Sequence, residues 1–362
     1  MTTRYGLIGA GMMGREHIKN IALLPDTDIA VYFEPDDGMA AKTHALVPNA
    51  QRAKTLQALL AHADLDCLVI ASPNFCHVDQ LREIAETRPL PTLVEKPLLT
   101  HSADIPFVET LSTGFGAPIW VAMEYRYMPP IAALCERADA VTGGVQLLSI
   151  REHRFPFLEK VGDWNRFNRY TGGTFVEKCC HFFDLMRLVL RAEPVRVMAS
   201  ASQAVNHLDE RYGNEAPDII DHGYVIVDFD SGSRAMLELC MFAEGAKYQE
   251  EISAVGRQGK LECQVPGPGR FWPAHLGPAP LPRVIESPRH PAGPVVTETP
   301  VDPSLLAAGD HNGSTFYQHR GFLELVRGER AQPAVSLADG LMAVRMGMAA
   351  QESAAAGQAV SL

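Results

Sequence analysis

Three glycines near the start of the chain, Gly9, Gly11 and Gly14, constrain its fold more than any other feature. They follow a short apolar run and open a helical pattern, with the spacing Gly-x-Gly-x-x-Gly. The first glycine suits a tight turn, the second lets the backbone approach a pyrophosphate, and the third lets the helix pack closely on the preceding strand. Turns are rich in glycine, so this spacing indicates a dinucleotide site only where the flanking sequence agrees.

An acidic residue stands where such a site needs one. Glu34 lies 20 residues after Gly14, at the end of the second predicted strand. A carboxylate there can accept hydrogen bonds from the ribose hydroxyls and repels a 2′-phosphate, and no arginine follows closely. The position therefore favours NAD over NADP. Asp36 and Asp37 are alternatives, as is a solvated acid at a strand end with no ligand.

The first third of the chain alternates short apolar runs with helical patterns. Strands are predicted at residues 5–8, 28–33, 67–71, 92–94 and 119–123, and helices at 12–24, 55–62 and 76–87. This alternation is typical of βαβ units and a parallel sheet. We therefore expect residues 1–123 to form an α/β Rossmann domain for dinucleotide binding.

The pattern changes after about residue 123. Longer strands are predicted at 144–153, 195–202, 222–229, 234–242 and 249–255, and helices at 129–138, 176–190, 315–327 and 337–356. We expect residues 124–362 to form an α+β domain with a large, mostly antiparallel sheet, used for substrate binding and oligomerisation. The final helix is expected to pack back on the first domain. Residues 264–303 hold 11 of the 26 prolines and are predicted to be mostly irregular.

Composition excludes several classes of function. Lys plus Arg is 32 and Asp plus Glu is 43, a formal net charge of -11, which disfavours nucleic-acid and anionic-membrane binding. No apolar run reaches the roughly 20 residues of a membrane span, and the N-terminus does not resemble a secretory signal. The seven cysteines are scattered without a C-x-x-C pair, so we expect reduced thiols in a cytoplasmic protein, with neither zinc nor disulfides.

Further motifs together carry a resemblance to one family. They are Ala71–His77, Glu95–Pro97, Tyr125–Tyr127, Gly172–Asp184 and Ala349–Ser353. With the glycine motif, their order resembles the Gfo/Idh/MocA oxidoreductases, which include sugar and inositol dehydrogenases. The resemblance covers nearly the whole chain, and the combination is specific although each piece alone is not.

The resemblance assigns a role to Lys96 and to a pair in the second domain. It implies that Lys96 is catalytic, and a lysine at the carboxyl end of a strand agrees with ligand binding at that edge. The family's D-x-x-x-H appears as Glu177 and His181, which on one helix would share a face, with Lys178 at its edge and Asp184 nearby. Glu177 stands where the family has an aspartate, and its longer side chain would orient His181 instead of contacting the substrate. Ion pairs that only dock the helix, or join Lys96 to Glu95, are the alternatives.

Two sets of binding residues follow. The residues expected at the cofactor are Gly9, Gly11, Met12, Met13, Gly14, Glu34, Ser72, Pro73, Asn74, His77, Glu95 and Lys96. Those expected at the substrate are Arg126, Arg154, Trp164, Asn168, Lys178 and His181. His311 and His319 are weaker candidates, His153 and His222 are expected to be structural, and Cys179 and Cys180 to pack beside the site. We predict no metal site.

The expected activity is an NAD-dependent oxidoreductase acting on a secondary alcohol of a cyclic polyol, sugar or inositol. His181 would be the general base, Glu177 would orient it, and Lys96 would polarise the oxygen. The opposite assignment, with Lys96 as the acid/base, stays open. The rival functions are an NAD-dependent glycoside hydrolase acting through transient oxidation and a non-catalytic NAD-binding regulatory protein. The expected partners are a small-molecule substrate and further copies of the chain, in a homodimer or homotetramer.

Overall fold

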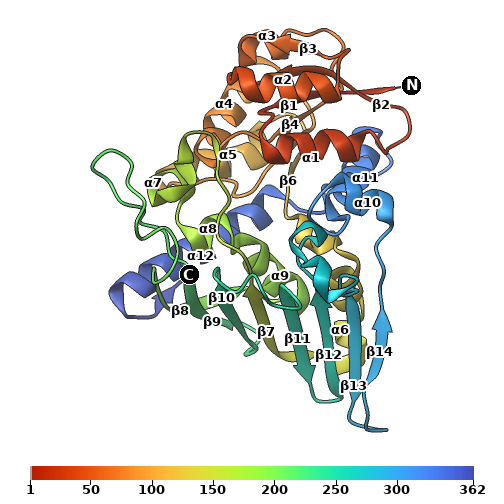
Figure 1. Cartoon of the computed structure of the whole chain (residues 1–362), viewed down its shortest axis with the longest axis vertical. Helices are drawn as coiled ribbons and strands as arrows, with labels where there is room; N and C mark the ends of the chain where they lie inside the picture. Colours follow the sequence, from red (N-terminus) through yellow and green to blue (C-terminus); the bar gives the residue numbers. More distant parts are fainter. Residues whose placement is uncertain (1) are drawn as a thin grey trace.

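The computed structural model describes residues 2–362 and contains two sheets, one above the other in Figure 1. The first is six-stranded and parallel, in the order β3-β2-β1-β4-β5-β6. Its strands are β1 (Thr3–Ile8), β2 (Thr27–Phe33), β3 (Gln51–Ala53), β4 (Cys67–Ile70), β5 (Thr92–Val94) and β6 (Ile119–Val121). The strand order reverses between β1 and β4, which is where ligands bind in open α/β sheets. The predicted Rossmann fold is confirmed.

Helices cover both faces of this sheet. They are α1 (Met12–Ile21), α2 (Asp37–Leu46), α3 (Leu56–Leu60), α4 (His77–Thr87) and α5 (Ile105–Gly114). Every residue of β4 and β5 is buried, as expected for strands covered on both faces. The sequence interpretation missed α2 and α5. In α2 only Ala40 and Thr43 are buried, so this helix has almost no apolar stripe to detect.

The second sheet is nine-stranded, in the order β14-β13-β12-β11-β7-β10-β9-β8-β15. Its strands are β7 (Val145–His153), β8 (Pro194–Ser202), β9 (His222–Phe229), β10 (Arg234–Cys240), β11 (Glu250–Gly256), β12 (Gly259–Val265), β13 (Arg283–Pro288), β14 (Val295–Glu298) and β15 (Val360–Ser361). Only the β7–β10 pair is parallel. The predicted large, mostly antiparallel sheet is confirmed.

Several helices of the second half cover one face of this sheet, and others contact the first domain. They are α6 (Pro129–Thr142), α7 (Asn168–Thr171), α8 (Thr174–Glu177), α9 (Cys180–Leu190), α10 (Pro303–Ala308), α11 (Ser314–Val326) and α12 (Leu337–Ala356). The last helix, α12, packs on β8 and α9 and also on α5 and β6. Among the helices of residues 2–362, none combines the length and apolar character needed to cross a membrane.

The proline-rich segment 264–303 is mostly irregular, as predicted, but it also holds β13 and β14, which form a hairpin whose first strand pairs with β12. Their prolines lie at strand ends or between strands, where no ladder hydrogen bond is lost. The helix predicted at 176–190 is broken into α8 and α9. At the break the Cys179 amide donates to the Thr174 carbonyl five residues back, as in a π-type turn.

Candidate functional site

Two cavities meet between the domains. The larger, of about 800 Å³, lies at the carboxyl edge of the first sheet, and the smaller, of about 110 Å³, opens toward the second domain. Both are lined by the same five residues, Met12, Met13, Lys96, Lys160 and Glu177. Ligands bound in the two cavities would therefore meet beside these five side chains.

The glycine motif shapes the larger cavity to fit a dinucleotide. Gly9 has φ +85°, and a side chain on it would collide with the Ser72 backbone. A Cβ on Gly11 would project into open space, the space that a pyrophosphate needs for close approach. No side chain caps the N-terminus of α1, which leaves its N–H groups available to an anion. Gly14 does not line the cavity but lets α1 pack against Gly9.

Glu34 also lines this cavity and is fixed by the backbone. Its carboxylate accepts hydrogen bonds from the Ala10 amide at 2.7 Å and the Asp36 amide at 2.9 Å. The alternatives have other tasks, since Asp36 caps α2 and Asp37 pairs with Arg52. The sequence interpretation missed Arg15, which lines the same cavity and donates to the Ala10 carbonyl at 2.9 Å.

Most of the other predicted cofactor residues also line the larger cavity. They are Met12, Met13, Ser72, Pro73, Asn74, Glu95 and Lys96. His77 does not, which corrects the prediction: it is fully buried, with Nδ1 2.8 Å from the Pro97 carbonyl and Nε2 3.1 Å from the Ser72 carbonyl. His77 thus joins the loop after β4 to the loop that carries Lys96. Glu95 is held in turn by His17, whose other ring nitrogen lies 2.8 Å from His319 Nε2.

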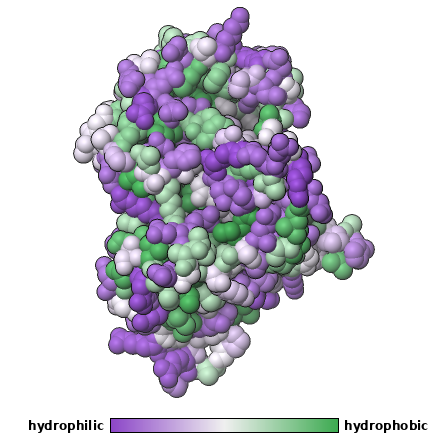
Figure 2. Space-filling view, turned by 90° about the vertical axis from the view of Figure 1, so that its left-hand side faces the viewer, coloured by the Kyte–Doolittle hydropathy of each residue, from purple (hydrophilic) through white to green (hydrophobic). Residues whose placement is uncertain are grey.

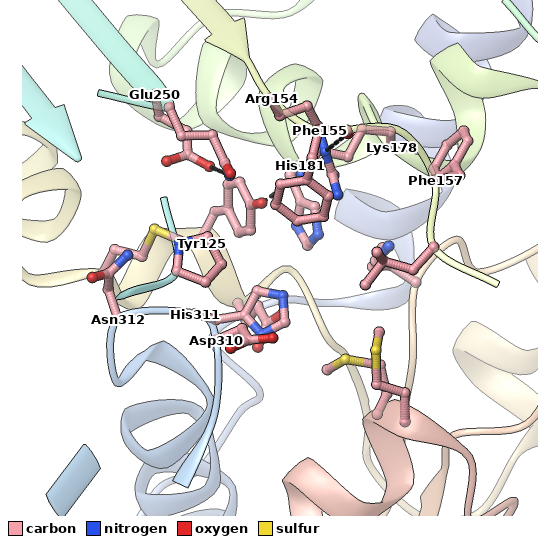
Figure 3. Close-up of a pocket in the computed structure, with 18 of the residues that line it drawn as sticks. Tyr125, Arg154, Phe155, Phe157, Lys178, His181, Glu250, Asp310, His311 and Asn312 are labelled. Carbon is pink, nitrogen blue, oxygen red and sulfur yellow. Dashed lines mark hydrogen bonds and ion pairs between the residues drawn. The ribbon is translucent and has the colours of Figure 1, made fainter. Parts of the chain in front are cut away.

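Lys96 and His181 flank the junction of the cavities. The Lys96 ammonium donates to the Glu177 backbone carbonyl at 3.2 Å. The His181 ring stacks on Tyr125, with centroids 4.1 Å apart and planes 7° from parallel (Figure 3). Burial, reinforced by Lys96 and Lys178, holds the pKa of His181 well below its ordinary value of 6.5. At neutral pH the ring is therefore uncharged and able to accept a proton.

The expected orienting role of Glu177 is not seen. Within residues 2–362 no hydrogen bond engages the His181 ring, and its Nδ1 is buried without a partner. The break between α8 and α9 removes the continuous helix on which that prediction depended. Both side chains still line the smaller cavity. Tyr125, which the sequence interpretation had not placed in the site, fixes the ring by stacking.

The floor of the smaller cavity is an ordered charge network. The Lys178 ammonium donates to the Tyr125 hydroxyl at 2.5 Å and to Glu152 at 2.8 Å. Glu152 lies directly opposite Glu250 in the β7–β11 ladder, and both are buried. Burial and the neighbouring Glu152 raise the pKa of Glu250 to about 7. Lys178 thereby links the paired carboxyls to the tyrosine under His181.

A second network places His311 in the smaller cavity. Its Nδ1 lies 2.7 Å from Glu16 and its Nε2 lies 3.6 Å from Glu124, which the Thr315 hydroxyl also contacts. These carboxylates raise the pKa of His311 to about 9 despite its burial. The ligand atoms of the three residues lie within 4.8 Å of one another, but a protonated imidazole between two carboxylates accounts for the cluster without a metal. His319, by contrast, is buried against His17.

The predicted substrate residues divide between several places. Arg154, Lys178 and His181 line the smaller cavity, whereas Trp164 lines the larger one beside Phe75. Asn168 lines neither cavity, and its side-chain amide instead donates a hydrogen bond to the Asp218 carbonyl. The prediction that Arg126 binds the substrate is also corrected. Its guanidinium forms two hydrogen bonds of 2.5 Å with Asp184 and a third with the Ala334 carbonyl, so it is engaged in structure.

Replacing Asp184 by alanine is expected to lower the free energy of unfolding by about 3–5 kcal/mol, because it leaves the buried Arg126 charge without its partner. Urea denaturation followed by circular dichroism measures this change. The matched control is Glu215→Ala, which breaks an exposed pair with Arg169 and should cost less than about 1 kcal/mol. Equal losses in the two variants would contradict the structural role of the Arg126–Asp184 pair.

Comparisons with known proteins agree with this architecture. Residues 3–120 match the family model "Oxidoreductase family, NAD-binding Rossmann fold", and residues 141–362 match "Oxidoreductase family, C-terminal alpha/beta domain". The inositol 2-dehydrogenase of Rhizobium meliloti is 27% identical over 73% of this chain and 76% of its own.

Two crystal structures share the fold. A myo-inositol dehydrogenase from Corynebacterium glutamicum superposes with a TM-score of 0.73 at 20% identity, covering 100% of this chain and 99% of that one. GenD2 from gentamicin A biosynthesis, in complex with NAD, superposes with a TM-score of 0.79 at 19% identity, covering 100% and 96%. Because the two family models together span both domains, the chain belongs to the Gfo/Idh/MocA family of NAD-binding oxidoreductases.

Proposed function

We propose that the protein is an NAD-dependent dehydrogenase that oxidises a secondary alcohol of a cyclic polyol or sugar. The observation that carries this proposal is the placement of an uncharged His181 and a lysine, Lys96, where the two cavities meet. A base and a cationic donor beside a dinucleotide cavity are the groups that alcohol oxidation requires. The inositol dehydrogenases among the relatives support the same class of substrate.

In the proposed reaction the two hydrogens of the alcohol group leave separately, one as a proton and one as a hydride. NAD bound in the larger cavity would supply the hydride acceptor. His181 takes the hydroxyl proton, and the Lys96 ammonium donates a hydrogen bond to the same oxygen as negative charge develops on it. The carbon loses its hydride and becomes a carbonyl, so the substrate gives up one proton and one hydride. Lys178 keeps Tyr125 in place beneath the His181 ring.

A panel of cyclic polyols and sugars at fixed NAD, followed by NADH absorbance, tests the proposal. The expected result is steady NADH formation with at least one compound. Glycoside cleavage without net NADH release would support the rival hydrolase instead. Binding of NAD with no turnover of any kind would support a regulatory protein and contradict the proposal.

Glu34→Ser is expected to shift cofactor use from NAD toward NADP, lowering the ratio of kcat/KM for NAD to that for NADP by at least about tenfold. The change removes an acceptor for the ribose hydroxyls and a charge that repels a 2′-phosphate, and Arg15 remains nearby. Steady-state kinetics with each cofactor measures the ratio. Asp37→Ser removes an exposed acid outside the cavity and is the control. An unchanged ratio in Glu34→Ser would refute the cofactor assignment.

We also propose that the chain forms a homodimer or homotetramer through the uncovered face of the nine-stranded sheet. Leu147, Met198, Tyr224 and Ile226 are exposed on that face, and Met198 and Ile226 are cross-strand partners. On the adjoining side of the molecule, at the left of Figure 1, Figure 2 shows hydrophobic residues interspersed with polar ones over the lower half. Light scattering should show an oligomer that Ile226→Glu weakens. A monomeric wild type would overturn this proposal.

A further inference from the structure

Three cationic side chains approach one carboxylate where the cavities meet. Lys96, Lys160 and Arg154 all line the smaller cavity, and each acts electrostatically on the buried Glu177. Lys160 was not anticipated from the sequence and lines both cavities. Its ammonium forms no hydrogen bond or ion pair with any other part of residues 2–362. One carboxylate thus faces three cations.

Most other charges of the smaller cavity have partners. Asp310 is bound by Arg270 at 2.6 Å, Lys178 by Glu152 at 2.8 Å, and His311 lies between Glu16 and Glu124. Glu250 accepts a hydrogen bond from Gln249 at 2.6 Å on one oxygen, and its other oxygen is buried without a partner in residues 2–362. Among the residues shared by the two cavities, Glu177 is the only carboxylate beside Lys96 and Lys160.

The donors of Arg154 and Lys160 remain available to a ligand. Arg154 uses its Nε on the Phe155 carbonyl, and its terminal nitrogen is 3.8 Å from Glu152, too far for a hydrogen bond. Lys96 is assigned to the reacting oxygen by the proposed function, which leaves Arg154 and Lys160. Partly buried cationic donors without acceptors are costly unless a ligand satisfies them. Oxidised nicotinamide would bring a further positive charge to the same junction.

We infer that the alcohol substrate is an anionic sugar whose carboxylate or phosphate group is bound by Lys160 and Arg154. This inference rests on the proposed dehydrogenase function. Binding of the anionic group by Lys160 and Arg154 leaves Lys96 and His181 for the chemistry. Arginine and lysine both bind oxyanions through charge-assisted hydrogen bonds. Lys160 and Arg154 would then determine specificity without taking part in proton transfer.

Matched substrates with the same ring test the inference: glucose, glucuronate and glucose 6-phosphate, and the three corresponding galacto compounds. The wild type is expected to use at least one anionic compound with a kcat/KM about tenfold or more above that of its neutral partner. Preference for the uronate or for the phosphate identifies which oxyanion the site takes. Equal or better use of neutral sugars and inositols would overturn the inference while leaving the dehydrogenase function intact.

Lys160→Met is expected to lower the ratio of anionic to neutral kcat/KM by about tenfold or more, and Lys160→Arg to restore part of it. The KM for NAD should be unchanged in both variants. Lys54→Met removes an exposed lysine that lines neither cavity and is the control. A rise in the KM for NAD with an unchanged substrate ratio would show that Lys160 serves the cofactor, and would overturn the inference.

Calorimetric titration separates this inference from the proposed function. Uronate or sugar phosphate is titrated into NADH-loaded wild type and NADH-loaded Lys160→Met. Binding to the wild type that is at least about tenfold weaker in the variant supports the anion site, even if no compound in the panel is oxidised. Absence of such binding, or equal binding to both proteins, overturns it.

Discussion

Replacing Lys96 by methionine is expected to lower kcat for alcohol oxidation by about 10²–10³-fold, the usual effect of removing one donor that stabilises a developing oxyanion. Lys96 follows β5, and its ammonium is held at the junction of the two cavities by the Glu177 carbonyl. Methionine keeps most of the length of the side chain but cannot donate. Turnover is measured by NADH formation, and NADH binding by its fluorescence.

Two further variants separate this effect from misfolding. Lys96→Arg keeps the charge and a donor but changes the shape of the group, so its kcat should lie between those of wild type and Lys96→Met. Lys54→Met should behave as wild type. If Lys96→Met bound NADH normally and kept more than about a tenth of wild-type kcat, Lys96 would not stabilise the oxyanion.

The residues that carry the chemistry of the site could be predicted from the sequence better than the contacts that hold them in place. The glycine motif, Glu34, Lys96 and His181 each belong to short local patterns, and the structure brings them to the two adjoining cavities. The groups that hold them come from distant parts of the chain. His17 contacts both Glu95 and His319, and no local spacing connects those positions.

Errors arose where one local pattern admitted two structures. Arg126 belongs to the Tyr125–Tyr127 motif and was expected at the substrate, but the Asp184 carboxylate binds it in a largely buried pair. Lys160 lies in a segment without regular periodicity, so only the fold shows that it reaches both cavities. The strand β12 was not predicted either, although its alternation of inward Leu261 and Cys263 with outward polar residues is visible in the sequence.

His181→Ala is expected to lower kcat by about 10²–10⁴-fold, the usual contribution of a positioned general base. The pH dependence distinguishes this role from a structural one. A base acts only when unprotonated, so kcat/KM falls as the pH drops through its pKa. Burial and the nearby Lys96 and Lys178 lower the pKa of His181 below 6.5. The wild type should therefore stay active below pH 6.5, with an acidic limb that is absent from the residual activity of His181→Ala.

Removing a neighbouring cation should move that limb in a known direction. Arg154 disfavours the imidazolium form of His181, so Arg154→Met is expected to raise the pKa of the ring and shift the acidic limb toward higher pH. Lys54→Met, far from the ring, should leave the limb in place. If the limb persisted in His181→Ala, another group would be the base, and Lys96 is the residue that the geometry then leaves for proton transfer. A limb that vanished with His181 and moved upward in Arg154→Met would instead place the proton on His181.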